Sequence, residues 1–219
     1  MNAITFSQLS RQGCLDSFPV VTRNAQRHHQ AALILSSIGD YGNAISHLIL
    51  GAEELLKASV LFLDGKGFNL RNKSGVNKIF YNHKARHAVA KEFFSVWLFV
   101  RKMILPDSYI GNSRRKILRQ GISLFYGAIF GLQNYEWWDN ADCLKQKGFY
   151  VDFADNIVNP ASFTDNEYNQ ALRYFNALRK DFDILIDSLG KLNQHEIDEV
   201  IELFSATELA ELIDESIKR

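Results

Sequence analysis

The chain has 219 residues, of which 47% are hydrophobic and 23% are charged, so it is long and apolar enough to fold around a core of its own. Lys and Arg number 25, and so do Asp and Glu, which excludes a global electrostatic attraction to nucleic acid or to an anionic membrane. Any such binding must come from a local patch of charge.

The ends and the apolar segments of the chain indicate its compartment. The first residues, "MNAITFSQLSRQG", lack the basic start and the apolar run of a signal peptide. The most apolar uncharged segment, "GISLFYGAIFGLQNY", is shorter than the roughly 20 residues that span a bilayer. The two cysteines, Cys14 and Cys143, have no metal-ligand spacing. We therefore expect a soluble cytoplasmic protein with reduced thiols and no membrane partner.

The N-terminal part of the chain predicts two helices. Residues 1–21 are expected to form an extension, after which Thr22 caps a helix over residues 23–38 with apolar residues at three- and four-residue spacing. The sequence "GDYG" interrupts the pattern, and Asp40 is the expected cap of a second helix that runs to about residue 64.

The middle of the chain predicts a loop and two further helices. Residues 65–79 are polar and contain Gly, which indicates a loop. A third helix is expected over residues 82–104, before Pro106, because the residue that precedes a proline avoids helical geometry. A fourth is expected over about 113–132.

The C-terminal part combines an irregular segment with short helices. Residues 134–163 show no helical period and are rich in aromatic residues and turn formers, so we expect an ordered crossing segment with a short strand or helical turn at "FYVDF". Three capping boxes follow, at Thr164 with Glu167, Asn193 with Glu196, and Ser205 with Glu208. They predict helices at about 165–189, 194–203 and 206–218.

Together these elements predict an all-α fold. It consists of a helical bundle of four to five main helices at residues 22–190, which includes the aromatic-rich crossing segment, and a short acidic helical appendage at residues 191–219.

The second helix carries charges in an otherwise apolar sequence. On a helical wheel its apolar residues form a broad arc that we expect to be buried, and the opposite side carries Ser46, Glu53, Lys57 and Asp64, with His47 and Glu54 at its edges. Glu53 stands four residues before Lys57, the favourable order for a helical ion pair. These charges are either a solvated face with one ordinary ion pair or part of a site, and His47 is expected to be structural.

The third expected helix contains a cluster of His and basic residues. His83 and His87 share a face, Arg86 lies on its flank, and Lys84 and Lys91 line its other edge. The His-x-x-x-His spacing can hold zinc, but the neighbouring cations disfavour a dication and favour an anion such as RNA phosphate. The histidines can also transfer protons near neutral pH, or simply pair within the bundle.

A second basic group lies earlier in the chain than this cluster, in the sequence "RNAQRHH". Arg23 stands five residues before His28, about the spacing at which Arg and His can hold a scissile phosphate and move a proton. A pair of this kind also arises by chance in a chain of this length.

Three segments together resemble the AbiV family of bacterial abortive-infection proteins. They are "NAQRHHQAALILSSIGDYGNAISHLILGAEELLKA", "HKARH" and "KGFYVDF", and the resemblance covers roughly residues 22–190. The chain has Leu56 where the family commonly has Gly, Phe149 where it has Leu, and Arg86 where it has Lys. The family is similar to the HEPN helical-bundle proteins, many of which are metal-independent RNases that work as dimers.

The resemblance implies a phage-defence role and a candidate site. In it Lys57, His83 and Arg86 bind phosphate, while Glu53 or Glu54 orients Lys57 or takes a proton, without a metal or cofactor. Arg23-Asn24 and His28 match the HEPN motif Arg-Asn-x-x-x-His, although that motif usually lies late in the bundle. Lys84 and His87 are further candidate phosphate contacts.

Two classes of function are compatible with these features. One is a HEPN-like metal-independent endoribonuclease that acts on RNA and halts translation in infected cells, with a phage protein as its trigger and no DNA substrate. The other is a helical dimer that binds a phage product or the translation machinery without chemistry. Gly127 and Gly131 favour a homodimer, because they allow another backbone to approach closely. Tyr135, Trp137 and Trp138 either anchor a partner or pack beneath a loop.

Overall fold

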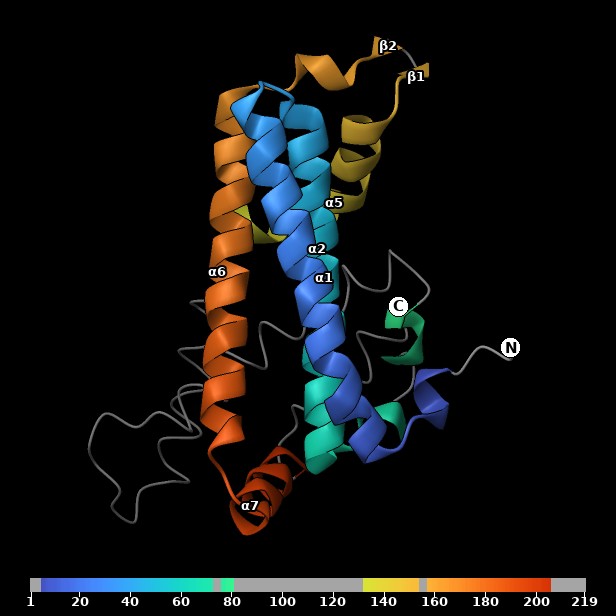
Figure 1. Ribbon diagram of the computed structural model, residues 1–219, viewed down its shortest axis with the longest axis vertical. Coiled ribbons are helices and arrows are strands. Elements are labelled where there is room, and N and C mark those ends of the chain that lie inside the picture. The colour runs from blue at the N-terminus through green and yellow to red at the C-terminus, as the bar shows by residue number, and fades with distance from the viewer. Residues whose placement is uncertain (1–4, 73–75, 81–131, 154–156, 206–219) are drawn as a thin grey trace, which may run out of the picture.

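The computed structural model describes residues 5–72, 76–80, 132–153 and 157–205. Its longer helices are α1 (Arg11–Ser37), α2 (Tyr41–Leu63), α5 (Leu132–Phe149), α6 (Asp165–Gly190) and α7 (Gln194–Ser205). Helices α1, α2 and α6 stand side by side, α5 lies along one half of α2, and α7 lies at the opposite end of the bundle (Figure 1). The expected all-α fold is confirmed.

Helix α2 is the centre of the bundle, because α1, α5 and α6 all pack on it. Most of its residues are buried, including Leu48, Ile49 and Ala52. A helix that is covered on several sides has no solvated face, so of the two alternatives for its charges the solvated face is wrong: Ser46 and Glu53 are buried. Asp64, which directly follows α2, is buried as well.

Helix α1 begins much earlier than the sequence predicted. Ser10 caps it by accepting a hydrogen bond from the Gly13 amide at 2.9 Å, and the Thr22 hydroxyl instead donates to the Phe18 carbonyl inside the helix. Residues expected in an N-terminal extension thus form the first part of α1. The helix continues through Pro19, and its early turns bury Cys14 in the core.

The cap predicted for α2 is confirmed, since the Asp40 side chain accepts a hydrogen bond from the Asn43 amide. The chain beyond α2 is more regular than the loop expected there. A π-helical turn (Asp64–Phe68) is followed by two 3₁₀ helices, Leu70–Asn72 and Val76–Phe80. Another 3₁₀ helix, Phe6–Gln8, precedes α1.

A buried ionic cluster holds this turn against the start of α1. The Asp64 carboxylate accepts hydrogen bonds from the Arg71 amide at 3.0 Å and from its Nε at 2.8 Å. The Arg71 guanidinium also donates to the Leu9 carbonyl, and the Cys14 thiol lies 3.6 Å from Asp64. Burial and the Asp64 charge raise the pKa of Cys14 to about 11, so this thiol is protonated and unreactive.

The segment expected to be irregular is largely helical. Residues 132–149 form α5, after which β1 (Asp152–Phe153) pairs antiparallel with β2 (Ile157–Val158) and a 3₁₀ helix (Pro160–Ser162) leads to α6. The buried positions of α5 recur at three and four residues, but two of them are not apolar, which concealed the helical period: Trp138, Ala141, Lys145 and Gly148. Of the two alternatives predicted for "FYVDF", a short strand or a helical turn, the strand is found, as β1.

The capping boxes at α6 and α7 are confirmed. Thr164 exchanges hydrogen bonds with Glu167, and Asn193 does so with Glu196. The helices observed, 165–190 and 194–205, match the predicted ones closely. The third and fourth predicted helices and the last one, at 206–218, lie outside the described residues.

Within the described ranges, none of the helices combines the length and the apolar character that crossing a bilayer requires.

Gly148 is the point of closest approach between α5 and α2. A Cβ atom at this position would overlap the Ser46 hydroxyl and the carbonyl of Gly42. The Ser46 hydroxyl also donates to the Lys145 carbonyl at 2.9 Å, so the two helices touch through backbone as well as side chains.

Replacing Gly148 by Ala is therefore expected to lower the free energy of unfolding by about 1–3 kcal/mol, because the added methyl forces the helices apart. Urea denaturation measures the change. Gly190→Ala is the matched control, since a Cβ there meets no atom within 4 Å, and it is expected to leave stability unchanged or slightly raised. Equal stability of both variants would contradict the close approach.

Candidate active site between α1, α2 and α5

Two histidines from neighbouring helices meet near the middle of the bundle. His28 of α1 and His47 of α2 are both half-buried, and their Nδ1 atoms lie 3.0 Å apart. The ring centroids are 5.3 Å apart, as expected for two rings that meet edge to edge through these nitrogens. The rings thus share one N–H···N hydrogen bond, in which one Nδ1 donates and the other accepts.

Both imidazoles are held in the neutral form near pH 7. Burial lowers the pKa of His28, and the neighbouring His47 lowers it further, while Glu54 acts in the opposite direction. Burial also lowers the pKa of His47, partly offset by the charge of Asp40. A neutral pair keeps a lone pair available to accept a proton.

Gly51 allows α1 to approach α2 closely enough for this contact. A Cβ atom at residue 51 would lie 3.3 Å from the Cβ of His28, 3.2 Å from the Ala25 carbonyl and 3.0 Å from the Phe175 ring. From the other side, the Phe149 ring of α5 meets His47 edge to face, with centroids 5.6 Å apart. The position of His47 is thus fixed by three helices.

An ion pair of α2 adjoins the histidines. Lys57 pairs with Glu54, and both side chains are largely but not fully buried, at 16% and 15% exposure. Both charges influence the pKa of His28, which places them in the same neighbourhood. Of the two glutamates named as possible partners of Lys57, Glu54 is the one that pairs with it, and the i,i+4 pair with Glu53 is not formed.

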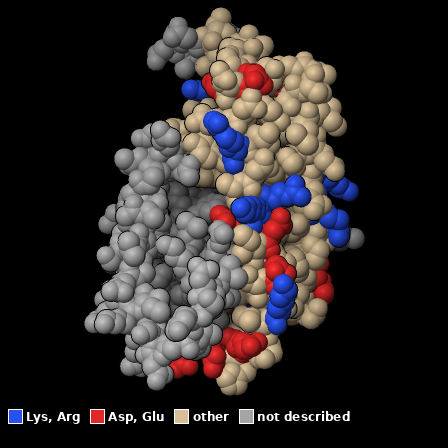
Figure 2. All heavy atoms as spheres, turned by 90° about the vertical axis from the view of Figure 1, so that its left-hand side faces the viewer, with Lys and Arg blue, Asp and Glu red and all other residues tan. Residues whose placement is uncertain are grey.

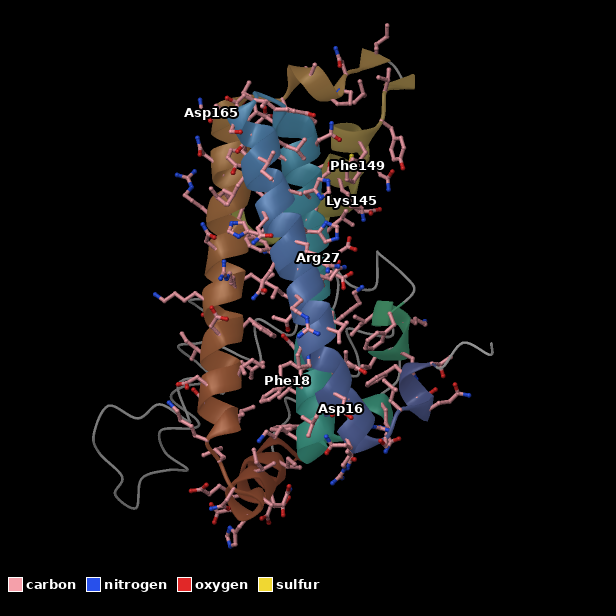
Figure 3. All side chains as sticks on the ribbon, in the orientation of Figure 1. Asp16, Phe18, Arg27, Lys145, Phe149 and Asp165 are labelled. Carbon is pink, nitrogen blue, oxygen red and sulfur yellow. The ribbon has the colours of Figure 1, made fainter. Side chains whose placement is uncertain are left out.

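Glu53 pairs instead with Lys145 of α5. The Nζ of Lys145 lies 2.7 Å from Glu53 and 2.9 Å from Asp142, and only 1% of the Glu53 side chain and 4% of the Lys145 side chain are exposed. Figure 3 shows Lys145 and Phe149 on the same helix beside α2. Because Glu53 is sealed inside the protein, it can set the electrostatics of the site but does not reach a substrate.

A third histidine of α1 has different surroundings. His29 stacks on Phe175 with centroids 4.8 Å apart, and its Nδ1 lies 3.4 Å from the Arg179 guanidinium of α6. Burial and the Arg179 charge lower the pKa of His29. Since its ring nitrogen faces a permanent cation, His29 has a packing role and is a useful control for its neighbour.

The other predicted site residues fall into three groups. Arg23 is exposed on the outer face of α1, whereas His28 faces α2, so the structure does not bring this pair together. Lys57 and Glu54 lie in the site described above. The remaining candidates lie outside the described residues, and their approach to Lys57 stays a prediction: His83, Lys84, Arg86 and His87.

Sequence reasoning missed His47 and Lys145 as members of the site. His47 was expected to be structural because it stands alone on its helix. Lys145 lay in a segment expected to be irregular. The hidden helical period of α5 was the one signal that pointed to it.

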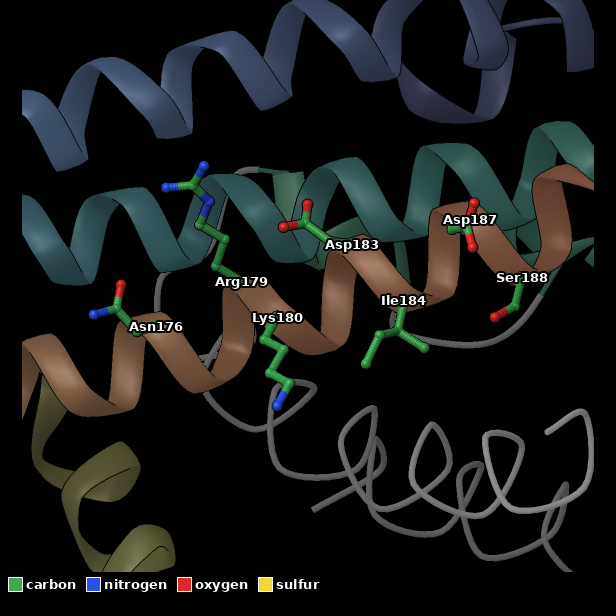
Figure 4. A pocket seen from close by; sticks show the side chains of 7 residues that line it. All are labelled: Asn176, Arg179, Lys180, Asp183, Ile184, Asp187 and Ser188. Atoms are coloured by element: carbon green, nitrogen blue, oxygen red, sulfur yellow. The ribbon is translucent and has the colours of Figure 1, made fainter. Parts of the chain in front are cut away.

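The described residues also bear on two further kinds of site, a metal site and a basic surface. They contain no group of three or more His, Cys, Asp or Glu side chains arranged to hold a metal ion. On the face that carries α6, acidic and basic side chains are interspersed (Figure 2). An open groove along α6 is likewise mixed in charge (Figure 4), and its lining includes Arg179, Lys180, Asp183 and Asp187.

The comparisons with known proteins agree with this fold. The all-α bundle is consistent with a HEPN-like fold. The family model of AbiV, a HEPN family, matches residues 17–179, and the chain belongs to the AbiV family. Membership suggests a role in abortive-infection or HEPN-type defence. No curated protein and no solved structure matches the chain.

The ion pair of Glu53 and Lys145 generates a stability prediction. Lys145→Met is expected to lower the free energy of unfolding by about 3–5 kcal/mol, because it removes a buried cation that contacts the Glu53 carboxylate at 2.7 Å. The double variant Glu53→Leu with Lys145→Met removes both charges and is expected to recover most of this loss. Urea denaturation of the wild type, the two single variants Lys145→Met and Glu53→Leu, and the double variant measures the coupling energy between the two residues. Additive losses would contradict a direct interaction.

The three half-buried histidines, His28, His29 and His47, generate a pH prediction. Their pKa values are lowered in the folded state, so the unfolded chain binds more protons at mildly acidic pH. Their contribution to stability is present above about pH 6.5, the ordinary histidine value, and is lost as the pH falls through the lowered values. Thermal unfolding at pH 7.5 and 5.5 is expected to give a lower midpoint at 5.5. The loss should be smaller in His29→Gln, and an unchanged or higher midpoint at pH 5.5 in the wild type would refute the prediction.

Proposed function

We propose that this AbiV-family protein acts in abortive infection as a metal-independent endoribonuclease, with His28 as the proton-transfer group and Lys57 as the phosphate clamp. The observation that carries the proposal is a neutral, half-buried histidine, His28, whose pKa is influenced by the charges of Lys57 and of Glu54, the carboxylate that holds this lysine in place. RNA contains its own nucleophile, the 2′-hydroxyl, so cleavage requires proton transfer and charge stabilisation, and both can come from side chains.

The chemistry assigns one task to each residue. His28 takes the proton of the 2′-hydroxyl as its oxygen attacks phosphorus. The Lys57 ammonium offsets the charge that develops on the phosphate oxygens, and Glu54 holds the lysine in position until phosphate replaces it. His83 and Arg86 are proposed to complete the clamp. RNA, a phage-derived trigger and a second copy of the chain are the proposed partners.

A second candidate is a binding protein without chemistry, which holds a phage product or part of the translation machinery. Large apolar side chains exposed where α1 ends and on β2 favour it: Ile34, Ile38 and Ile157, with 65%, 74% and 70% exposure.

The two candidates differ in whether RNA is cut. Purified wild-type protein is expected to cleave RNA in EDTA. His28→Gln should lower the rate about 10²–10⁴-fold by loss of proton transfer. Lys57→Met should lower it about 10²–10³-fold by loss of charge stabilisation. His29→Gln is the matched control, since it alters the adjacent residue outside the pair, and is expected to remain active.

The same variants, together with His83→Ala, should be compared in infected cells for RNA integrity and phage growth. Fragments that appear on infection and are absent in the folded His28 and Lys57 variants support the nuclease. Intact RNA in cells that still block phage growth would refute it and favour the binding protein. Cleavage in EDTA that depends on His83 but not on His28 would move the site to the third predicted helix.

A further inference from the structure

We propose that Tyr150 and Lys147, at the end of α5, bind one unpaired nucleotide of single-stranded RNA, with the Tyr150 ring stacked on the base and the Lys147 ammonium on the adjoining phosphate. This inference rests on the proposed function for the place where RNA is cut. It goes further by naming an unpaired nucleotide beside that place as what the protein selects.

The Tyr150 ring is set apart by its exposure. Of the aromatic side chains that the structure describes, only this one is exposed, at 62%, whereas the others are buried or half-buried. Within the described part of the chain its hydroxyl has no hydrogen-bond partner. The neighbouring Val151 is exposed as well, at 55%. An aromatic face that is open to solvent is the feature on which an unpaired base stacks.

This exposed ring lies beside the candidate site. Phe149, the last residue of α5, meets the His47 ring edge to face with centroids 5.6 Å apart (Figure 3). The Tyr150 ring lies next to Phe149, with centroids 6.2 Å apart and ring planes at 65°. A single aromatic side chain thus separates Tyr150 from His47. A base stacked on Tyr150 is therefore held within a few nucleotides of a phosphate bound near the histidines.

Lys147 supplies a positive charge on the same side of α5. The Tyr150 amide donates to the Gln146 carbonyl at 2.9 Å, so the helical hydrogen-bond pattern extends to Tyr150. Residues three apart on a helix are neighbours on its surface, which brings Lys147 beside the ring. Lys147 is exposed and forms no ion pair within the described ranges, whereas Lys145 is paired with Glu53. The charge of Lys147 is therefore available to a phosphate.

The two residues between Lys147 and Tyr150 pack in the other direction. Gly148 lies against Ser46 of α2, and Phe149 lies against His47. The end of α5 is thus anchored on one side and presents an aromatic ring with a cation on the other. Proteins that bind single strands combine these two elements, a stacking platform and a positive charge that follows the backbone. In a duplex the neighbouring pairs cover the base faces, so the site requires an unpaired nucleotide.

An exposed tyrosine can also contact a protein partner. The free lysine beside the ring favours RNA, because Lys is depleted in protein interfaces and is a common phosphate contact. A stacking site also makes a demand that an apolar protein contact does not make. It requires an aromatic ring, which an aliphatic side chain of similar size cannot replace.

The first test measures RNA binding without cleavage. A fluorescent single-stranded 2′-O-methyl RNA of mixed sequence lacks the 2′-hydroxyl nucleophile, and its Kd for the full chain is measured by anisotropy in EDTA. Tyr150→Ala is expected to weaken binding about 5–150-fold, the range for one base stacked on an aromatic side chain. Tyr150→Phe should bind like the wild type, and Tyr150→Leu like the Ala variant. The same RNA annealed to its complement should bind equally to wild type and Tyr150→Ala.

The second test measures how binding depends on salt. Lys147→Ala is expected to reduce the slope of log Kd against log salt by about 0.7, the contribution of one phosphate of a single strand. Lys180→Ala is the matched control, since Lys180 is an exposed lysine of α6 that also lacks an ion pair within the described ranges. It is expected to leave the slope unchanged. An equal slope in the wild type and in Lys147→Ala would refute the phosphate contact.

The third test separates a binding role of Tyr150 from a structural one, with unmodified RNA as substrate. A stacked base is held equally before and during cleavage, so Tyr150→Ala is expected to raise KM and leave kcat nearly unchanged. If the ring only supports Phe149 and His47, its loss lowers kcat and leaves KM and Kd unchanged, which refutes the nucleotide site. Circular dichroism and the melting midpoint verify that each variant folds.

The outcomes distinguish this site from the proposed nuclease. A wild-type protein that binds no single-stranded RNA refutes both. RNA that is bound through Tyr150 and Lys147 but is not cut refutes the nuclease and supports the site. RNA that is cut by Tyr150→Ala with the wild-type KM refutes the site alone. A Tyr150→Leu variant that binds RNA like the wild type refutes stacking and favours a protein contact.

Discussion

The buried ion pair of Glu53 and Lys145 is the interaction on which the rest of the described structure depends. Taking two charges out of water is costly, and the interaction is favourable only when geometry and neighbouring polar groups compensate. Here the Nζ–carboxylate distance is 2.7 Å, Asp142 contacts the same ammonium, and the lysine carbonyl accepts from Ser46. These contacts fix the rotation of α5 on α2, and that rotation places Phe149 against His47.

The packing of three helices around α2 explains why small residues occur along it. A central helix surrounded by three others needs places where backbones come together, and Gly42 and Gly51 supply them on different sides. At Gly42 the backbone around Pro160 and Gly148 of α5 pack closely against α2. At Gly51, α1 and the Phe175 ring of α6 pack closely against it. The contact between His28 and His47 therefore follows from backbone spacing and does not require any special conformation of the histidines.

Part of this arrangement could be predicted from the sequence, and the rest depends on tertiary contacts. Local sequence signals were enough to predict the helix caps Asp40, Thr164 and Asn193, because the residues that form a cap lie within one helical turn. The wheel of α2 placed Glu53 on the side opposite the apolar arc, and a wheel of one helix does not show that a neighbouring helix, here α5, buries that side. The pairing of His28 with His47 spans two helices, and no spacing along one helix reports it. Thr22 looked like a cap because regular apolar spacing follows it, but α1 begins earlier and continues through Pro19, and packing of Cys14 and its neighbours offsets the local cost of that proline.

The site combines features that would be weak separately. Half-burial keeps the two imidazoles neutral, and neutrality is what lets them share a hydrogen bond and hold opposite tautomers. Lys57 would repel a proton from that pair if its charge were unopposed, but Glu54 neutralises it in the free protein. A phosphate group that displaced Glu54 would take over this neutralising role and free a carboxylate at the same moment. Substrate binding and the charge balance of the histidines are thus coupled through one lysine, so a substitution at Lys57 acts on proton transfer as well as on binding.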